Sequence, residues 1–578
     1  MKKIIPYISL TIFFVALLFP LIEVYFTVNT TWQGVTPGYN DSVYYYARMH
    51  EVKDGNPFIG NPFLLEHSKE IAPAFFVSDW VAAAPLFLGL SFTSTVIFDM
   101  LFWSIMFVFF LFLFLKQLDI SKEVSSIIAV FAYLCVYSLM MRAVSMQIVF
   151  PFFAFFLFAF TNWLKNPENK KNIFVLILAT TFSFYIYTYL WQITFVTLFI
   201  GMITFLIMRD KTKTKHLSLI IFSSLFLALL LFIYSLKQVI HPFYWESMQR
   251  IGLVNTHLLA SNVFYSGFWV LVMIVLLYIT KRWTNNVYFI FVFSGLAMII
   301  ASTSNIITGK ELENSQHIER FIIVWLVCAF GSLLFFIYKH KSDFYNLSNG
   351  YKIVLVIVSF ISLFGVLKYF NEYNIYFSVV DELKSQSLYL QKYAPPLKWL
   401  ETNENKQSVI WTDSTYLIRY VPVMTKHYLL FTPGTSHLHL LSNKELEERY
   451  LVYSYFNNLS LKDIENQYRD FAGVGNAVHQ YKTHNRAVTL CKFFRLDFFG
   501  ANCGELTDMV SFKGEAYFVN LYNQYHDDIK KNIEIELKKF NVRYAIKDKK
   551  YLSAFRPDLL IHSIKVYDDE NFAIYKLN

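Results

Sequence analysis

The sequence predicts a polytopic α-helical membrane protein, with about eleven transmembrane helices and a C-terminal mixed α/β domain. Apolar residues make up 55% of the 578 residues and charged residues only 16%, whereas soluble domains carry about 25% charged residues. Residues 1–370 consist of long apolar runs between short charged clusters, and charged residues recur throughout 371–578. We therefore predict a membrane domain (1–370) followed by a soluble domain (371–578) of ordinary size.

The apolar runs set the number of predicted spans, because a helix needs about 20 mostly apolar residues to cross a bilayer. The predicted spans are 4–26, 93–115, 123–141, 143–164, 172–189, 190–208, 217–236, 263–280, 287–304, 321–338 and 352–370. The first run follows two lysines, but its length and the lack of a small-residue cleavage site predict a retained anchor rather than a signal peptide.

Loop charges predict the orientation, because loops rich in Lys and Arg remain in the cytoplasm. The N-terminus and alternate loops carry Lys2, Lys3, Lys116, Lys122, Lys165, Lys170, Lys171, Arg209, Lys211, Lys213, Lys215, Lys281, Arg282, Lys339, Lys341 and Lys352. The other short loops carry only Arg142, Lys237, Arg250, Lys310 and Arg320. The N-terminus is therefore predicted in the cytoplasm of a plasma (inner) membrane and, after an odd number of spans, the C-terminal domain outside it. These loops also explain the net charge of +9 without a nucleic-acid partner.

Most of the polar chemistry falls in the predicted outer segments, which are 27–92, 237–262, 305–320 and 371–578. The first of them far exceeds the usual connection of about 4–6 residues. Within it, residues 41–53 have the composition of a helix, and GNPFIGNPF (55–63) ends that helix. The apolar stretch 72–90 is interrupted by Pro73, Asp79 and Pro85 and is predicted to lie in the membrane interface.

Asp41 stands at the start of this predicted helix, in GYNDSVYYYARMHEV (38–52). One interpretation is an N-cap, in which the carboxylate accepts a backbone N–H. The other is a functional acid, because ionisable groups at membrane depth are costly and commonly face a cavity. The second is favoured by other ionisable residues predicted at the same membrane face, which are Glu23, Glu66, His67, Asp79 and Asp99.

With these features the chain resembles the GT-C superfamily of integral-membrane glycosyltransferases, which use polyprenyl-phosphate-linked sugars. The stretch Asp41-Ser-Val-Tyr44-Tyr45-Tyr46-Ala-Arg48 is similar to the one that opens the first outer loop in oligosaccharyltransferase catalytic subunits. The resemblance implies that Asp41 is the catalytic acid or a ligand of a divalent metal, the one cofactor implied. It further implies an inverting transferase of the cell envelope.

The sequence departs from this family at two places. The stretch VIWTDSTYL has only Trp411 and Asp413 of the Trp-Trp-Asp-Tyr-Gly motif of oligosaccharyltransferases. Ser42 follows Asp41, where protein O-mannosyltransferases and lipid A aminoarabinose transferases have an Asp-Glu pair. The resemblance therefore implies the fold and the broad class, and leaves open whether the acceptor is a glycan, a lipid or a protein.

Two further outer segments supply candidates for binding donor or acceptor. Breaking a sugar–phosphate bond leaves negative charge, which Arg binds through paired donors and Lys as a point charge. The scarce outer positive charges, Arg142, Arg250, Lys310 and Arg320, are the phosphate candidates. The other candidates are Glu66, His67, Asp79, Glu246, His257 and His317. Each of these also has an ordinary interpretation as a solvated loop residue or, for an Arg beside a span, a snorkelling side chain.

The C-terminal region has the pattern of a small mixed α/β domain. SVIWT (408–412) and YAIKD (544–548) are typical of strands, and NKELEERYLVYSY (443–455) and DDIKKNIEIELKKF (527–540) of helices. Cys491 and Cys503 are twelve residues apart and, if extracellular, able to form a disulfide. Cys135 and Cys328 fall in predicted spans, where packing is the ordinary role.

The leading functional hypothesis is transfer of a sugar from a polyprenyl-phosphate-linked donor to an acceptor at the outer face, with Asp41 as general base or metal ligand. A transporter or flippase is one alternative, although transporters place polar residues at the membrane midplane, whereas here they gather at one face. A non-catalytic scaffold for assembling surface polysaccharide is the other, and it would not require Asp41.

Overall fold

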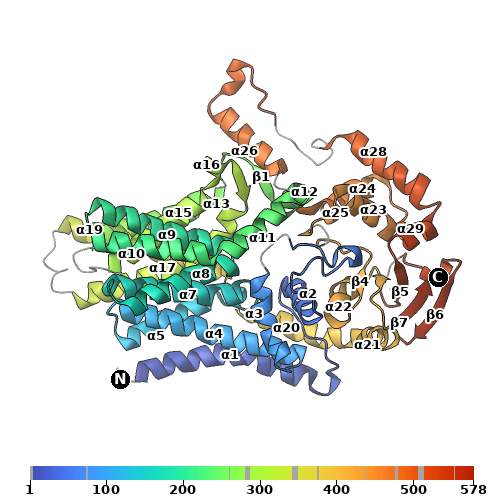
Figure 1. Ribbon diagram of the computed structural model, residues 1–578, viewed down its shortest axis with the longest axis horizontal. Helices are drawn as coiled ribbons and strands as arrows, with labels where there is room; N and C mark the ends of the chain where they lie inside the picture. Colours follow the sequence, from blue (N-terminus) through green and yellow to red (C-terminus); the bar gives the residue numbers. More distant parts are fainter. Residues whose placement is uncertain are drawn as a thin grey trace.

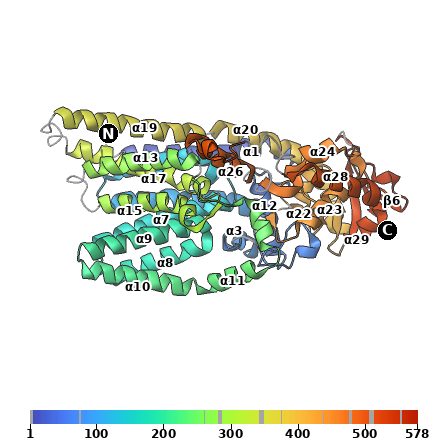
Figure 2. The same ribbon diagram turned by 90° about the horizontal axis from the view of Figure 1, so that it is seen from above.

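The computed structural model describes residues 4–72, 76–259, 261–279, 287–340, 349–373, 376–435, 438–474, 480–504, 513–551 and 554–577. A helix bundle occupies one end of the long axis and a mixed α/β region the other (Figures 1 and 2). Some residues used in the sequence predictions lie outside the described residues: Lys2, Lys3, Pro73, Thr280, Lys281, Arg282 and Lys341.

Every predicted span coincides with helix, which confirms the helical character of the N-terminal two-thirds of the chain. The helices of the bundle are α1 (Ile5–Val28), α4 (Phe92–Gln117), α5 (Lys122–Cys135), α6 (Tyr137–Met140), α7 (Ser145–Lys165), α8 (Lys170–Ile186), α9 (Thr188–Ile207), α10 (Lys211–Leu227), α11 (Leu229–Ile240), α13 (Ser261–Ile279), α15 (Val287–Ser302), α16 (Asn305–Thr308), α17 (Asn314–Lys339) and α19 (Asn349–Tyr373).

The predicted number of eleven spans is not confirmed. Over the residues that the structure describes, six helices are long and apolar enough to cross a membrane, and α10 with α11 make a seventh if that bent pair, with an angle of 53°, is one span. The predicted span 123–141 breaks after Cys135, where the chain leaves helical geometry at Val136. The described helix α8 has 17 residues, at the lower limit of the length that a span needs.

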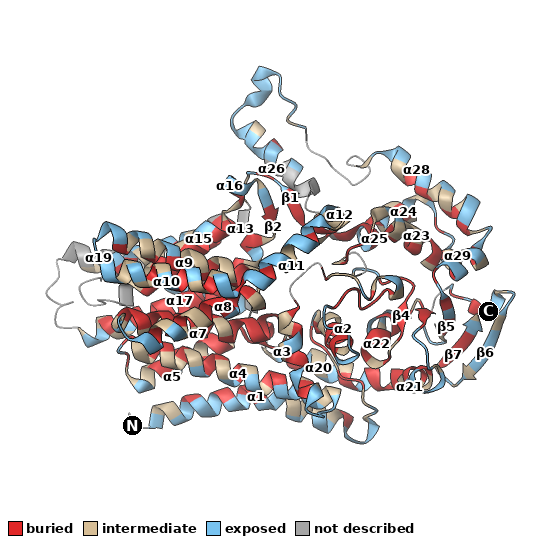
Figure 3. Ribbon diagram, viewed as in Figure 1, coloured by how far each residue is buried: buried red, intermediate tan, exposed pale blue. Residues whose placement is uncertain are grey.

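The apolar side chains on the outside of the bundle indicate a multi-pass membrane protein. Only 28% of the apolar window of the helix at Ile5–Thr31 is buried inside the protein, and Phe222, Phe226 and Leu230 on α10 and α11 are largely exposed. Figure 3 shows exposed residues along α1 and α10 and a buried interior at α7 and α17. A bundle with such a surface is stable in lipid, because the same surface in water would be an extended apolar patch.

The long loop between α1 and α4 has two helical segments, of which the first coincides with the helix predicted at 41–53. These are α2 (Ser42–Lys53) and α3 (Val77–Phe87), with the 3₁₀ turns η2 (Asn29–Thr31) and η3 (Leu65–His67). The α2 helix ends before Gly55, whose φ of +90° favours glycine. Arg48 on α2 and Asp79 on α3 form a buried ion pair with distances of 2.9 and 2.7 Å, which fixes the two helices to each other.

The C-terminal region contains one five-stranded mixed sheet, with the strand order β4-β3-β5-β7-β6. The strands are β3 (Val409–Trp411), β4 (Tyr428–Leu429), β5 (Val542–Asp548), β6 (Ser563–Asp568) and β7 (Phe572–Leu577). β3 pairs in parallel with β4 and β5, and β7 pairs antiparallel with β5 and β6. The two strands predicted from the sequence correspond to β3 and β5.

Helices make up most of the rest of the described C-terminal region. They are α20 (Tyr376–Leu390), α21 (Ala394–Asn403), α22 (Thr415–Met424), α23 (Asn443–Tyr453), α24 (Leu461–Asn466), α25 (Tyr468–Val474), α26 (Gln480–Phe493), α28 (Glu515–Gln524) and α29 (Ile533–Lys539). Short turns connect them, namely η4 (Gln391–Tyr393), η6 (Tyr455–Asn457), η8 (Leu496–Phe499), η9 (Tyr525–Ile529) and η10 (Pro557–Leu559). The two predicted helical stretches contain α23 and α29.

The long loop and the C-terminal region pack into one continuous core. The Leu429 N–H of β4 donates to the Phe63 carbonyl at 2.7 Å, and the Tyr420 hydroxyl of α22 donates to the Thr36 carbonyl at 3.1 Å. The buried Gln391 side chain donates to the Val35 carbonyl at 2.9 Å. The start of α2, where Asp41 lies, is therefore held between the helix bundle and the sheet.

Candidate functional site

Asp41 occupies the N-cap position of α2, but within the described part of the chain its side chain makes no capping hydrogen bond. Its two carboxylate oxygens instead accept hydrogen bonds from Nε and Nη2 of Arg142. The capping interpretation of Asp41 is therefore wrong. The pair is only partly buried, since 35% of the Asp41 side chain and 15% of the Arg142 side chain remain exposed.

The turn that carries Arg142 is fixed to α2 by the residue after Asp41. Arg142 lies in the short connection between α6 and α7, and the Ala143 N–H there donates to the Ser42 hydroxyl at 3.1 Å. That hydroxyl in turn donates to the Tyr39 carbonyl at 2.6 Å, and Ser42 is fully buried. Ser42 therefore positions Arg142 opposite Asp41.

A polar cavity of about 480 Å³ opens beside Asp41. One wall comes from the long loop and the other from segments that follow the parallel strands β3, β4 and β5. The lining residues are Asn40, Asp41, Val43, Tyr44, Phe63, Asp413, Thr415, Ile418, Arg419, Pro433, Gly434, Thr435, Tyr453 and Tyr551. The carboxyl ends of parallel strands are the usual place for a ligand in an open α/β sheet, so this cavity has the setting of a binding site.

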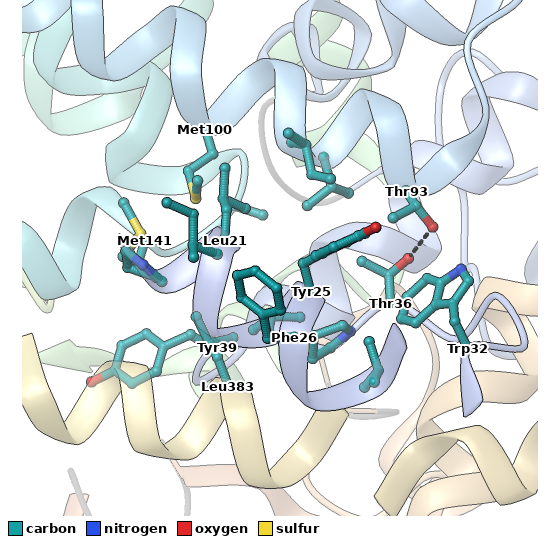
Figure 4. A pocket seen from close by; sticks show the side chains of 18 of the residues that line it. Leu21, Tyr25, Phe26, Trp32, Thr36, Tyr39, Thr93, Met100, Met141 and Leu383 are labelled. Carbon is teal, nitrogen blue, oxygen red and sulfur yellow. Dashed lines mark hydrogen bonds between the residues drawn. The ribbon is translucent and has the colours of Figure 1, made fainter. Parts of the chain in front are cut away.

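An apolar cavity of about 780 Å³ is lined in part by the turn that carries Arg142 (Figure 4). Met141 and Ala143, the neighbours of Arg142, line it together with the last turns of α1 and the start of α4. Leu21, Tyr25 and Phe26 project into it from α1. Asp41 thus lines the polar cavity, and the two neighbours of its partner Arg142 line the apolar one, which puts the pair between them.

Behind Arg142, α17 contributes two further predicted candidates, His317 and Arg320. His317 hydrogen-bonds through Nδ1 with the Tyr187 hydroxyl and through Nε2 with Glu313 at 3.3 Å. The charges of Arg320 and Arg142 both act on that Tyr187 hydroxyl. Nη1 of Arg320 is buried and, among the described residues, has no hydrogen-bond partner. The structure therefore brings four of the predicted residues, Asp41, Arg142, His317 and Arg320, to one place.

The three tyrosines of the quoted stretch face different surroundings. Tyr44 lines the polar cavity and Tyr46 the apolar one, while Tyr45 lies near the ion pair. Burial raises the pKa of Tyr45, the Asp41 charge raises it further, and the Arg142 charge lowers it. Tyr45 also acts electrostatically on Tyr187. Two of the three rings therefore line a cavity beside the Asp41–Arg142 pair.

Arg250 and Glu246 lie on α12 (Tyr244–Ile251), which contacts the C-terminal region. Arg250 is fully buried and donates to the carbonyls of His439 and Leu441, at 3.0 and 2.7 Å, and to the Asn443 side chain at 2.6 Å. Glu246 accepts from the Asn443 N–H at 2.8 Å. These contacts fix α12 to the segment before α23 and direct Arg250 away from a phosphate role.

His257 and Lys310 lie close to a small hairpin of β1 (Leu253–Asn255) and β2 (Lys310–Leu312). Nδ1 of His257 is 2.9 Å from the Ile306 carbonyl. Lys310 places its Nζ 3.9 Å from the centre of the Trp245 ring. Neither residue lines the polar or the apolar cavity beside Asp41.

Glu66 and His67 form ionic contacts between the long loop and α23. The buried Arg449 of α23 contacts Glu66 at 2.8 Å and Glu445 at 2.9 Å. His67 lies 2.8 Å from both Glu445 and Glu70. Burial lowers the pKa of His67, but the two carboxylates outweigh it and raise that pKa to about 9. Burial raises the pKa of Glu445, and His67 and Arg449 outweigh it, lowering it to about 2.

This contact makes the stability of the protein depend on pH. A pKa of His67 raised from 6.5 to about 9 gives stabilisation that is complete below about pH 6.5 and is lost as the pH rises toward 9. We expect thermal unfolding of the wild type and of His67→Gln to differ most near pH 6 and to converge by about pH 9. A constant difference across this range would show that His67 contributes only by packing.

The arrangement of acids does not fit the predicted divalent metal. Among the described residues, no group of three or more His, Cys, Asp and Glu side chains is placed to hold an ion. The carboxylate of Asp41 is bound by a guanidinium, and Asp413 is the other carboxylate that lines the polar cavity. A site built from protein ligands alone needs three or more of them for Zn²⁺ or Ca²⁺, and two carboxylates fall short of that number.

Three residues that the sequence did not select as site candidates contact the predicted ones or line the polar cavity. Tyr187 and Glu313 position His317, and Asp413 lines the polar cavity although it belongs to an incomplete motif. The break in the apolar run at YIYTYL (185–190) is the only local signal for Tyr187. Cys491 and Cys503 form a disulfide with a Cα–Cα distance of 5.6 Å, as the sequence allowed.

No protein-family model matches the sequence, and no curated protein sequence matches it either. Among solved structures the chain is similar to the oligosaccharyltransferase of Archaeoglobus fulgidus. The apo crystal structure is 12% identical, with 94% of this chain and 70% of that chain covered and a TM-score of 0.41. Its complex with an inhibitory peptide and a dolichol-phosphate is 11% identical, with 94% and 69% covered and a TM-score of 0.40.

A third structure of that enzyme, a complex with Zn and sulfate, is 11% identical, with 81% of this chain and 69% of that chain covered and a TM-score of 0.33. The chain is thus distantly similar to an archaeal oligosaccharyltransferase, which agrees with the resemblance seen in the sequence. TM-scores of this size carry no residue role from those proteins to this one.

Proposed function

We propose that this protein is a membrane glycosyltransferase that moves a sugar from a polyprenyl-phosphate-linked donor to an acceptor at the outer face of the membrane. The observation that carries the proposal is the position of the Asp41–Arg142 pair between an apolar and a polar cavity. A lipid-linked sugar has the matching order of parts: an apolar chain, a phosphate and a polar sugar.

In this proposal the apolar cavity holds the first units of the polyprenyl chain, and the arginines hold the phosphate. Arg142 supplies two parallel donors, the geometry that phosphate and carboxylate share. The buried Nη1 of Arg320, which has no partner among the described residues, is the kind of donor that a phosphate oxygen satisfies. The phosphate then replaces Asp41 as the partner of Arg142.

Released from Arg142, the Asp41 carboxylate acts as the general base. The acceptor nucleophile loses its proton to Asp41 while it forms a bond to C1 of the sugar, and the C1–O bond to phosphate breaks. The phosphate leaves with both bonding electrons, and Arg142 and Arg320 stabilise the charge that develops on it. Attack opposite the leaving group inverts the configuration at C1. The polar cavity, with Asp413 and Arg419, takes the acceptor, which is a glycan, a lipid or a protein.

A transfer assay with purified protein in liposomes tests this function. We expect radiolabel to pass from a polyprenyl-phosphate-linked sugar to a polar acceptor mixture, with release of the unglycosylated polyprenyl phosphate. A flippase would move the labelled lipid across the bilayer with its sugar–phosphate bond intact, and a scaffold would do neither. Either of those results would overturn the proposal.

The proposal also requires that the C-terminal region 371–578 lie outside the membrane and the N-terminus in the cytoplasm. Reporter fusions after Lys213 and after Asn405 should give cytoplasmic and extracytoplasmic signals respectively, because loop charges favour this orientation. The same signal at both positions would contradict the topology, and with it a site at the outer face of the plasma membrane.

A further inference from the structure

A disulfide-closed arm projects from the C-terminal region. The arm consists of α26 and η8, residues 480–504, and the Cys491–Cys503 disulfide closes its end. The Nε2 atom of His484 lies 3.2 Å from the Gly504 carbonyl, which joins the two sides of the arm nearer its base. The loop between the cysteines, which are twelve positions apart, is thus held at both sides of its base.

The tip of this arm displays four phenylalanines. Phe493, Phe494, Phe498 and Phe499 are 76%, 61%, 74% and 86% exposed. Elsewhere in the C-terminal region exposed apolar side chains are more scattered, for example Ile535 and Ile561. Four large rings within seven residues form an apolar surface that is costly in water, and such surfaces usually mark a contact site.

The position of the arm indicates what it contacts. In Figure 1 the arm rises beside α16 and β1, and its tip leans away from the sheet, toward the helix bundle. Figure 2, turned by 90°, places α26 at the same position along the long axis. In both views this is the level where the membrane helices end and the C-terminal region begins. A bilayer around the bundle would have its interface at this level.

The chemistry of the tip agrees with that position. Aromatic rings concentrate at membrane–water interfaces, and Lys and Arg extend their charges to the headgroups. Arg495 lies over the Phe498 ring at 4.3 Å, and Lys492 is exposed beside the disulfide. Over residues 480–504 the basic residues are Lys482, Arg486, Lys492 and Arg495 against one acid, Asp497. This excess of positive charge is attracted to anionic phospholipids.

We propose that the arm is a membrane anchor, whose four phenylalanines insert into the lipid interface beside the bundle. The proposal is independent of the catalytic one. The arm gives the C-terminal region an attachment to the bilayer in addition to its contacts with the bundle. It would thereby hold the sheet, and the cavity at its carboxyl ends, at a fixed height above the lipid.

Photo-crosslinking of the full chain in liposomes tests the anchor. The photoreactive residue p-benzoylphenylalanine replaces Phe499 in one variant and Phe493 in a second, so that a folding defect in one does not decide the result. The matched control replaces Ile561, which is 83% exposed and lies near β6 at the far end of the molecule (Figure 1). The vesicles contain phosphatidylcholine and phosphatidylglycerol, and mass spectrometry identifies what each variant captures.

We expect phospholipid adducts at positions 499 and 493 in at least about tenfold excess over position 561, since burying one phenylalanine shifts partitioning by about that factor or more. Equal lipid labelling at all three positions would overturn the proposal. Adducts at 499 and 493 to a second copy of the chain, or to another protein, would overturn it too and identify the tip as a protein interface.

Discussion

Asp41→Asn should lower the rate of sugar transfer by about 10²–10⁴-fold, the usual contribution of a general base. The amide keeps the shape of the side chain but loses its basicity. The same change leaves Arg142 without a charged partner at a site where 15% of its side chain is exposed. We therefore also expect the free energy of unfolding to fall, by about 1–2 kcal/mol because the pair is partly solvated.

The Arg48–Asp79 pair in the same loop supplies the control. Asp79→Asn also removes the carboxylate that binds a buried arginine, Arg48, so its cost in stability should be at least as large. Asp79 lines neither the polar nor the apolar cavity described. Transfer rates are measured well below both melting temperatures. If Asp79→Asn loses as much activity as Asp41→Asn, or if Asp41→Asn retains the wild-type rate, then Asp41 does not act as the base.

Asp41, Arg142, His317 and Arg320 could be selected from the sequence because a membrane protein has few charged residues to choose from. Each charge near the bilayer carries a cost, so those that remain have either a partner or a function. This reasoning identifies candidates and not their partners. It therefore gives Arg250 and Arg142 the same phosphate role, although Arg250 donates to carbonyls that lie about 190 residues later in the chain.

The same limit explains Glu66 and His67. Their contacts, Arg449 and Glu445, are about 380 residues away in sequence, and no local pattern records such a pairing. The packing of the long loop against α22 and β4 is likewise a property of the tertiary fold. The helices were easier to predict, because apolar runs of this length have one satisfactory conformation in lipid. The number of spans was harder to predict, since α5 ends within an unbroken apolar run.

Asp413 shows the opposite case, because the comparison of motifs gives it no role but the fold places it in the lining of the polar cavity. Its stretch lacks most of the oligosaccharyltransferase motif, yet it follows β3 and lines the cavity opposite Asp41. The register of a parallel sheet, and not a sequence motif, places it there. The acceptor side of the proposed site therefore does not carry the oligosaccharyltransferase motif, and the acceptor has to be found by experiment.

Arg142→Gln should lower donor use by about 10²–10³-fold, the effect of removing one well-placed donor from a developing negative charge. Arg142→Lys should lower donor use by a smaller factor. Lysine keeps the charge but cannot bind two phosphate oxygens in parallel. The measurement is the initial rate of transfer against donor concentration, at fixed acceptor. A phosphate ligand predicts a change in the dependence on donor, with the dependence on acceptor less affected.

Arg419→Gln is the matched control, since it removes the same charge from the lining of the polar cavity. Arg419 is exposed and belongs to α22, on the side proposed for the acceptor. If the site only needed a positive field, the two variants would lose donor use to a similar extent, because each removes one positive charge from it. If Arg142 binds the phosphate directly, only Arg142→Gln should show a strong loss of donor use. Equal donor kinetics in the two variants would remove Arg142 from the phosphate site and leave Arg320 as its principal candidate.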